Sequence, residues 1–196
     1  MSNPGQANPR PPRTASAVAE AEGPGELPVG LQFREAMSRL ACGVVIVTTV
    51  VDGVPWGMTV SACCSVSMDP PLILVSLAGQ TNSAVTIRER GRFGVSILGA
   101  NSVEVARFGA APGQPKFIPH FCGPDEEHPM ASPNVISALA HVDCTVESEV
   151  PAGDHVLFIG RVGQVRGVHG QEVWDSPLVY YRRDYYGLGS LQDVLR

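Results

Sequence analysis

Two long apolar runs near the end of the chain constrain the fold most strongly. Residues 138–150 read ALAHVDCTVESEV, and residues 154–168 read DHVLFIGRVGQVRGV. Both runs are rich in the β-branched residues that favour strands. The PAGD at 151–154 has the composition of a hairpin turn. The sequence therefore predicts two long strands joined as an antiparallel hairpin.

Further strands and a few short helices are predicted before and after this hairpin. Strands are expected at 44–51, within 57–71, at 72–78, at 92–98 and, as a strand pair or a strand with a turn, at 177–188. Residues 52–57, DGVPWG, are expected to form a turn, and residues 110–134, with six prolines, a long loop. Helices are expected at 31–41, 81–91 and 101–109, the second with Thr81 or Asn82 as N-cap and Gly91 at its end.

The small number of helices decides the fold class. A doubly wound parallel sheet would need a helix after nearly every strand, and no G-x-G-x-x-G follows a strand. The pattern predicts a mainly β protein, an antiparallel β-barrel with a few short peripheral helices.

The first thirty residues differ in composition from the rest of the chain. Residues 1–30 are dominated by Pro, Gly, Ala and Ser and contain no apolar core of a signal peptide, which predicts a flexible tail. The remaining 31–190 form one predicted domain, since 196 residues with 44% hydrophobic content suit a single core. No segment reaches the roughly 18 consecutive apolar residues of a membrane span. We expect a soluble, cytoplasmic protein that does not bind a membrane.

Charge and cysteine content argue against two classes of partner. The net charge is −5 without a basic patch, so a nucleic-acid partner is not expected. Five cysteines without a C-x-x-C favour free thiols over a disulfide framework or a zinc site. No metal site is predicted, because four of the histidines lack ligand-like spacing: His120, His128, His141 and His169.

Small polar side chains are unusually frequent in residues 57–71, GMTVSACCSVSMDPP. The alternation of apolar and polar residues predicts a strand there. Taken alone, the pattern is that of an edge strand whose serines and threonines are hydrated. The alternative is a strand against which a flat ligand lies close to the backbone, because Gly57 and Ser61 lack bulk.

Five segments in a fixed order carry a resemblance to a known family. They are FREAMSRLACGVVIVTT, GMTVSACCSVSMDPPLILVSL, SAVTIRERGRFGVSIL, GDHVLFIGRV and PLVYYRRDYYG, together spanning roughly 31–188. This order resembles the flavin reductase family, the reductase components of two-component flavin-dependent monooxygenases. The resemblance implies a split β-barrel with antiparallel, Greek-key strands. It also implies a homodimer that passes a hydride from NADH or NADPH to FMN or FAD, and a separate monooxygenase that receives the reduced flavin.

The resemblance implies which residues contact the flavin ring and its side chain. In the strand at 57–71 it implies Met58, Thr59, Val60, Ser61, Cys63 and Ser65. The chain departs from the family pattern at Ala62, Cys63 and Cys64, where Ser, Phe and Thr are common. A thiol is a weaker partner than a hydroxyl.

The flavin phosphate is expected at the start of the helix at 81–91. The resemblance implies contacts from Gln80, Thr81, Asn82 and Ser83. The first N–H groups of a helix are free and its dipole is positive there, which suits an anion. The alternative for these residues is an ordinary N-cap.

Three further residues are assigned from the resemblance. His155 is expected to position the nicotinamide or the flavin edge, with Asp154 as a turn former; the alternative for His155 is a turn or surface residue. Tyr185 is expected to pack on the nicotinamide or adenine, or else to cover a barrel end or a dimer interface. Phe117, with Lys116, lies in the long loop, which is expected to cover the site from the second subunit.

Two functions remain open on the sequence. The first is an NAD(P)H-dependent flavin reductase, with NADH and FMN favoured. Hydride transfer between cofactors requires alignment rather than a strong acid or base, so the lack of a catalytic triad does not argue against an enzyme. The second is a flavin-binding carrier or sensor protein without turnover on the same barrel.

Overall fold

The computed structural model describes residues 27–123, 130–167 and 176–189. The chain divides into two units, residues 1–36 and 37–196, which are treated separately. Helix α1, Val29–Ser38, begins inside the predicted tail and ends before the predicted residue 41. The rest of the tail, residues 1–26, lies outside the described residues.

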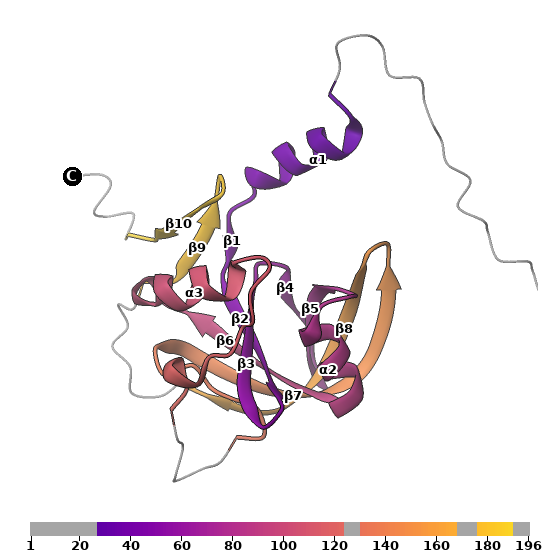
Figure 1. The fold of residues 1–196 in the computed structure, drawn as a ribbon, viewed down its shortest axis with the longest axis vertical. Helices are drawn as coiled ribbons and strands as arrows, with labels where there is room; N and C mark the ends of the chain where they lie inside the picture. Colours follow the sequence, from indigo (N-terminus) through magenta and orange to yellow (C-terminus); the bar gives the residue numbers. More distant parts are fainter. Residues whose placement is uncertain (1–26, 124–129, 168–175, 190–196) are drawn as a thin grey trace, which may run out of the picture. The chain divides into compact units, whose positions relative to one another are not determined.

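Seven strands of the second unit form one antiparallel sheet (Figure 1). Its order is β3-β2-β6-β7-β8-β5-β4. The predicted long hairpin is confirmed: β7 and β8 pair from His141↔Arg166 to Ala152↔His155. The seven strands are β2 (Val45–Val51), β3 (Val54–Val60), β4 (Cys63–Met68), β5 (Pro71–Ala78), β6 (Arg92–Leu98), β7 (Ala138–Ala152) and β8 (His155–Arg166).

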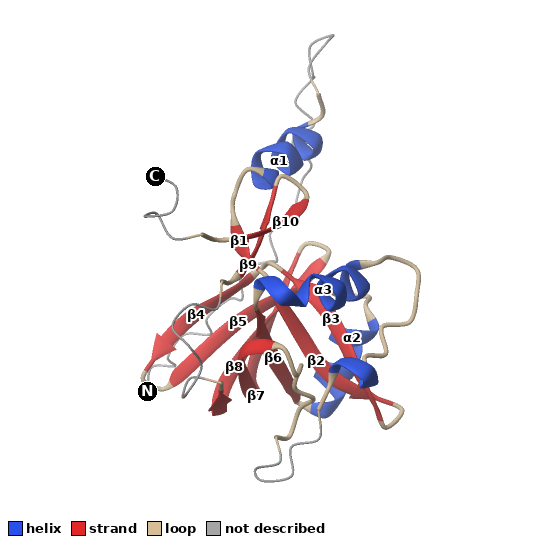
Figure 2. Cartoon of the chain, turned by 90° about the vertical axis from the view of Figure 1, so that its left-hand side faces the viewer, coloured by secondary structure: helices blue, strands red, loops and turns tan. Residues whose placement is uncertain are grey.

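Figure 2 shows the edge strands β4 and β3 on opposite sides of the curved sheet, and the chain joins these two edges at one corner. β3 and β4 are consecutive in the chain but lie at opposite edges, joined only by Ser61 and Ala62. Three Cα steps span at most about 11 Å, so the edges cannot separate there. The Ala62 carbonyl also accepts a hydrogen bond from the Ser76 amide at 3.0 Å. The predicted barrel is confirmed, whereas the single strand predicted within 57–71 is wrong, because the chain turns this corner at Ser61.

The predicted turn at 52–57 is too long. Only Asp52 and Gly53 form the turn, with φ of 50° and 78°, which is the conformation of a two-residue Asp-Gly hairpin. Residues 54–57 already belong to β3 and pair with β2. Pro55 is compatible with this strand because β3 is at an edge of the sheet.

Two short helices flank the sheet. α2, Asn82–Arg90, follows β5, has Thr81 as N-cap, and ends at Gly91 with φ of 65°, as predicted. The helix expected at 101–109 begins as a 3-10 turn, η1 (Ala100–Ser102), and continues as α3 (Val103–Ala110).

A small second sheet has the order β1-β9-β10. It consists of β1 (Cys42–Gly43), β9 (Leu178–Tyr181) and β10 (Asp184–Gly187). The strand pair predicted within 177–188 is confirmed. In the described parts of the chain, no helix is both long and apolar enough to cross a bilayer.

Strand β2 lies between two buried cores. Val45 and Val47 pack into the cluster that includes Phe93 and Phe158. Ile46 packs into the cluster that includes Val105 of α3. Both faces of β2 are therefore covered, which explains why residues 44–51 lack regular polar alternation.

Candidate functional site

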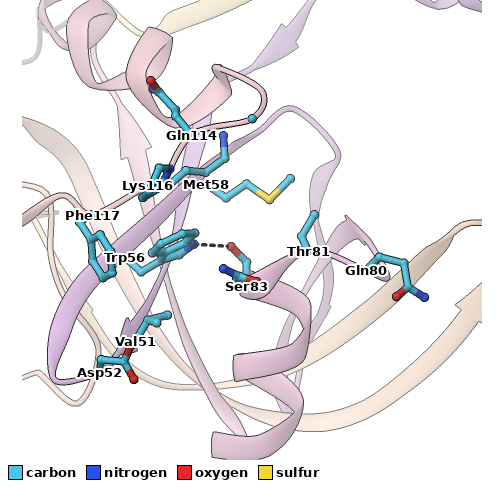
Figure 3. A pocket seen from close by; sticks show the side chains of 13 residues that line it. Val51, Asp52, Trp56, Met58, Gln80, Thr81, Ser83, Gln114, Lys116 and Phe117 are labelled. Atoms are coloured by element: carbon cyan, nitrogen blue, oxygen red, sulfur yellow. Dashed lines mark hydrogen bonds between the residues drawn. The ribbon is translucent and has the colours of Figure 1, made fainter.

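A cavity of about 590 Å³ lies between β3, the start of α2 and the segment that follows α3 (Figure 3). Six predicted cofactor residues meet there: Met58, Gln80, Thr81, Asn82, Ser83 and Phe117. They come from three parts of the chain that only the fold brings together. Seven further residues line the cavity: Val51, Asp52, Trp56, Gly113, Gln114, Pro115 and Lys116.

Part of the predicted long loop is held against the edge of β3. The Gly57 amide donates to the Lys116 carbonyl at 3.0 Å, and the Ile118 amide donates to the Pro55 carbonyl at 2.9 Å. Phe117 therefore lines a cavity formed by its own chain. Its position there does not require the second subunit, from which this loop was expected to cover the site. Residues 124–129 of this loop lie outside the described residues.

The hydroxyl of Thr81 is used within the protein. It donates to the Ala78 carbonyl at 2.8 Å and accepts from the Ala84 amide at 3.3 Å. Both bonds fix the start of α2. The main-chain N–H groups of Asn82 and Ser83 belong to the first turn, where a helix supplies no acceptor. This end of the cavity suits an anionic group.

Trp56 is one of the cavity residues that sequence analysis missed, and it has the most specific contacts. Its Nε1–H donates to Ser83 Oγ at 3.0 Å, and both residues are buried (Figure 3). The Phe117 ring meets the indole edge-on, with centroids 4.9 Å apart. Because strand residues two apart share a face, Trp56 could have been paired with Met58 had residues 54–57 been assigned to a strand.

Lys116 closes the cavity next to the end of α3. Its Nζ donates to the carbonyls of Gly109 and of Ala111, the latter at 2.8 Å. The ammonium group thus satisfies carbonyls that the end of a helix leaves free. Burial lowers the pKa of Lys116.

The next three residues predicted to contact the flavin ring, which follow Met58 in the chain, have surroundings other than the cavity. The Thr59 hydroxyl donates to the Ala106 carbonyl at 2.7 Å, and the Val60 side chain belongs to the core. Ser61 is exposed at the corner between β3 and β4. None of these three residues lines the cavity.

Two more of these predicted contacts lie on β4. Ser65 is exposed, opposite Ile73 of β5. Cys63 packs against the core, and burial, with the neighbouring Cys64, raises its pKa to about 11. Its sulfur is therefore a neutral thiol at physiological pH. Neither residue lines the cavity.

His155 is the first residue of β8 and lies opposite Ala78, the last residue of β5. Its Nδ1 is 2.7 Å from the Asp154 carboxylate, and this hydrogen bond lowers the pKa of Asp154. The Asp154 carbonyl accepts from the Gly79 amide at 2.9 Å. The structure thus holds His155 beside the turn that leads into α2, although not in the wall of the cavity.

Tyr185 lies away from the cavity, on β10. Its ring centroid is 5.3 Å from that of Tyr180, and its hydroxyl donates to the Ala106 carbonyl at 3.4 Å. Burial raises its pKa. The described contacts of Tyr185 are thus with the smaller sheet and α3.

Comparison with known proteins places the chain in a family. The flavin reductase like domain matches residues 37–189. The chain is 41% identical over 160 residues to "Flavin reductase (NADH)" of Kitasatospora aureofaciens, covering 80% of each. It is 33% identical over 159 residues to "Flavin-dependent monooxygenase, reductase subunit HsaB" of Rhodococcus jostii (strain RHA1), covering 80% of this chain and 77% of that protein.

A solved structure shares the fold. BorF, the flavin reductase component of a bacterial two-component tryptophan halogenase, superimposes with a TM-score of 0.71 at 32% identity. The match covers 82% of this chain and 99% of BorF. The family match extends over most of the chain, and it includes β2 to β10 and the cavity described above. The chain belongs to the flavin reductase like domain family.

Proposed function

We propose that this protein is an NADH-dependent flavin reductase that reduces FMN or FAD and supplies the reduced flavin to a separate monooxygenase. The observation that carries the proposal is the meeting of Met58 with residues 80–83 in one cavity of a flavin reductase domain. The relative from Kitasatospora aureofaciens is named as an NADH flavin reductase, and the one from Rhodococcus jostii as the reductase subunit of a monooxygenase.

The residues present fit a flavin. The start of α2 offers the N–H groups of Asn82 and Ser83 for a phosphate. Apolar and aromatic side chains of Met58, Trp56 and Phe117 form the adjoining wall. We place the ring system at the corner after β3, where Ser61 is exposed, and propose that Thr59, Val60, Cys63 and Ser65 contact it through their main chain.

The protein's contribution to the reaction is alignment. Bound flavin supplies a ring that accepts a hydride from the reduced nicotinamide. The Asp154 carboxylate accepts the Nδ1–H of His155, which leaves Nε2 directed away from that bond. We assign His155 the role of positioning residue for the nicotinamide, and Tyr185 a supporting role near the second substrate.

We further propose a cytoplasmic homodimer. β4 is an edge strand of the large sheet and exposes the apolar side chains of Val66 and Met68. An exposed apolar edge strand favours pairing with a second copy. All five cysteines are free thiols, as expected in a reducing compartment where NADH is also available.

The alternative is a flavin carrier or sensor without turnover. The two functions differ in whether bound flavin is open to NADH. Purified protein is mixed with NADH and excess FMN in air, and the absorbance of reduced nicotinamide is followed, with NADPH in a parallel reaction. Oxidation well above the uncatalysed rate supports the reductase. Binding of FMN without oxidation of either nucleotide supports the carrier.

A further inference from the structure

We propose that Trp56 is a positioning residue that orients the Ser83 hydroxyl as a donor to the flavin phosphate, and so makes the site selective for phosphorylated flavins over riboflavin. This inference rests on the proposed function, because it concerns the same cavity.

Thr81 and Ser83 use their hydroxyl groups differently at the start of α2. The Thr81 hydroxyl donates a hydrogen bond to the Ala78 carbonyl and accepts one from the Ala84 amide. Ser83 accepts the indole N–H of Trp56. Within the described residues, the structure gives the Ser83 proton no acceptor. Ser83 therefore keeps a hydroxyl donor that the protein itself does not use.

The hydrogen bond from Trp56 restricts the direction in which the Ser83 hydroxyl can donate. A serine hydroxyl has one proton and two lone pairs, and it rotates to suit its partners. The N–H of Trp56 occupies one lone pair, so the proton must point elsewhere. Ser83 lines the cavity next to the free N–H groups of the first turn of α2. A phosphate bound there would accept from the amides and from this hydroxyl together.

The indole of Trp56 is held in place by its surroundings. Trp56 is only 5% exposed, and its backbone pairs with Thr49 of β2 on one side and with Phe117 on the other. The Phe117 ring also packs edge-on against the indole. The Trp56 donor is therefore fixed before any ligand binds. Such preorganisation lowers the cost of orienting Ser83 on binding.

A purely structural role for the same hydrogen bond makes a different prediction. If Trp56 only joined β3 to α2, its replacement would weaken every flavin to the same extent. FMN and riboflavin share the ring and ribityl chain, and only FMN carries the phosphate. The ratio of their dissociation constants therefore reports the phosphate contact separately from the stability of the site.

The experiment compares the parent protein with Trp56→Phe, Ser83→Ala and the double variant. Dissociation constants for FMN and for riboflavin are measured by flavin fluorescence, and turnover of NADH with FMN is measured on the same samples. Trp56→Phe keeps an aromatic ring but removes the indole N–H together with the second ring, and the riboflavin measurement reports what is lost through packing alone. We expect FMN binding to weaken about five- to tenfold in each single variant while riboflavin binding changes less than about twofold. The double variant should resemble Ser83→Ala, since Trp56 acts through Ser83.

Three results would overturn the inference. An equal loss of FMN and riboflavin affinity in Trp56→Phe would show a structural role. Suppose that the ratio of the FMN and riboflavin dissociation constants is unchanged in Trp56→Phe, whereas Ser83→Ala loses part of its preference for FMN. This result would show that Ser83 does not need Trp56 to orient its hydroxyl. An unchanged ratio in Ser83→Ala would remove the hydroxyl as donor. Failure of the proposed function is seen separately, as lack of NADH oxidation by the parent protein whatever the binding ratios are.

Discussion

The hydroxyl of Thr59 donates to the backbone carbonyl of Ala106 at 2.7 Å and so fastens β3 to α3. The same carbonyl accepts the hydroxyl of Tyr185 from β10 at 3.4 Å. One carbonyl of α3 thus links the large sheet with the small one. The hydroxyl of Thr59, which the sequence suggested for flavin, is already used in the fold.

The close approach of α3 and β3 predicts the effect of Gly109→Ala. A Cβ at this position would lie 2.5 Å from Thr59 Oγ1 and 3.0 Å from the Thr59 amide nitrogen. To relieve this contact, the Thr59 hydroxyl must rotate away from the Ala106 carbonyl, or α3 must shift away from β3. Alanine gains up to about 1 kcal/mol in helix propensity, whereas overpacking costs about 1–3 kcal/mol. We expect a net loss of about 1–2 kcal/mol in the free energy of unfolding, measured by urea denaturation.

Gly43→Ala is the matched control for this variant, because a Cβ there meets nothing within 4 Å. It should change the stability by less than about 0.5 kcal/mol. A stabilised Gly109→Ala would show that helix propensity outweighs the contact with Thr59.

The buried His141 predicts a loss of stability in acid. Its Nδ1 lies 2.8 Å from Ser96 Oγ and its Nε2 3.2 Å from Ser132 Oγ. Burial lowers its pKa from 6.5 to about 4, against the smaller opposing effect of Asp143. Between pH 6.5 and about 4, the folded state therefore binds fewer protons than the unfolded state. Stability is full above pH 6.5 and falls as the pH drops towards 4, by an amount on the order of 3 kcal/mol.

The test compares the pH dependence of unfolding in the parent and in His141→Gln. Between pH 6.5 and 5 most carboxylates stay ionised, so the slope in this window reports histidines. The variant is expected to lose most of that slope even if it is less stable at every pH. Equal slopes in the two proteins would contradict a buried neutral His141.

Ser61→Leu tests whether the flavin ring lies at the corner between β3 and β4. Ser61 is exposed there, so a larger side chain meets solvent and the fold should be unchanged. If the ring lies against this backbone, FMN affinity should fall by about 10- to 100-fold. The affinity is measured by fluorescence titration and the fold by thermal unfolding. Parent-like affinity in a folded variant would place the ring elsewhere.

His155→Ala tests the positioning role of this histidine. We expect hydride transfer, followed by stopped flow as loss of NADH absorbance, to slow by roughly tenfold or more. FMN affinity should change much less, since His155 does not line the cavity. Asp154→Asn keeps the histidine but alters its partner, so an intermediate rate is expected. Unchanged hydride transfer in His155→Ala would remove the role.

Met68→Lys tests the proposed dimer. The side chain of Met68 is 85% exposed on the edge strand β4. A charge there should weaken pairing with a second copy, seen as a shift towards the monomer in analytical ultracentrifugation. A variant that sediments as the parent does would exclude this edge as the interface.

Local sequence determined most of the secondary structure. The hairpin of β7 and β8, the N-cap Thr81 and the end of α2 at Gly91 follow from residues that are neighbours in the chain. Backbone preferences and side-chain capping act over a few residues, so they can be read without knowing the fold. The resemblance to a known family supplied the rest of the expected architecture and the candidate residues.

Tertiary structure alone decided which of those residues share a cavity. Trp56 and Ser83 are 27 positions apart, and they meet because β3 lies at the edge of the sheet beside α2. The same fold directs the Thr59 hydroxyl to Ala106 and carries Ser65 onto the opposite edge. Whether a side chain faces a ligand, a helix or solvent depends on strand register and on the corner at Ser61. Both are set by contacts between distant segments, which no local pattern records.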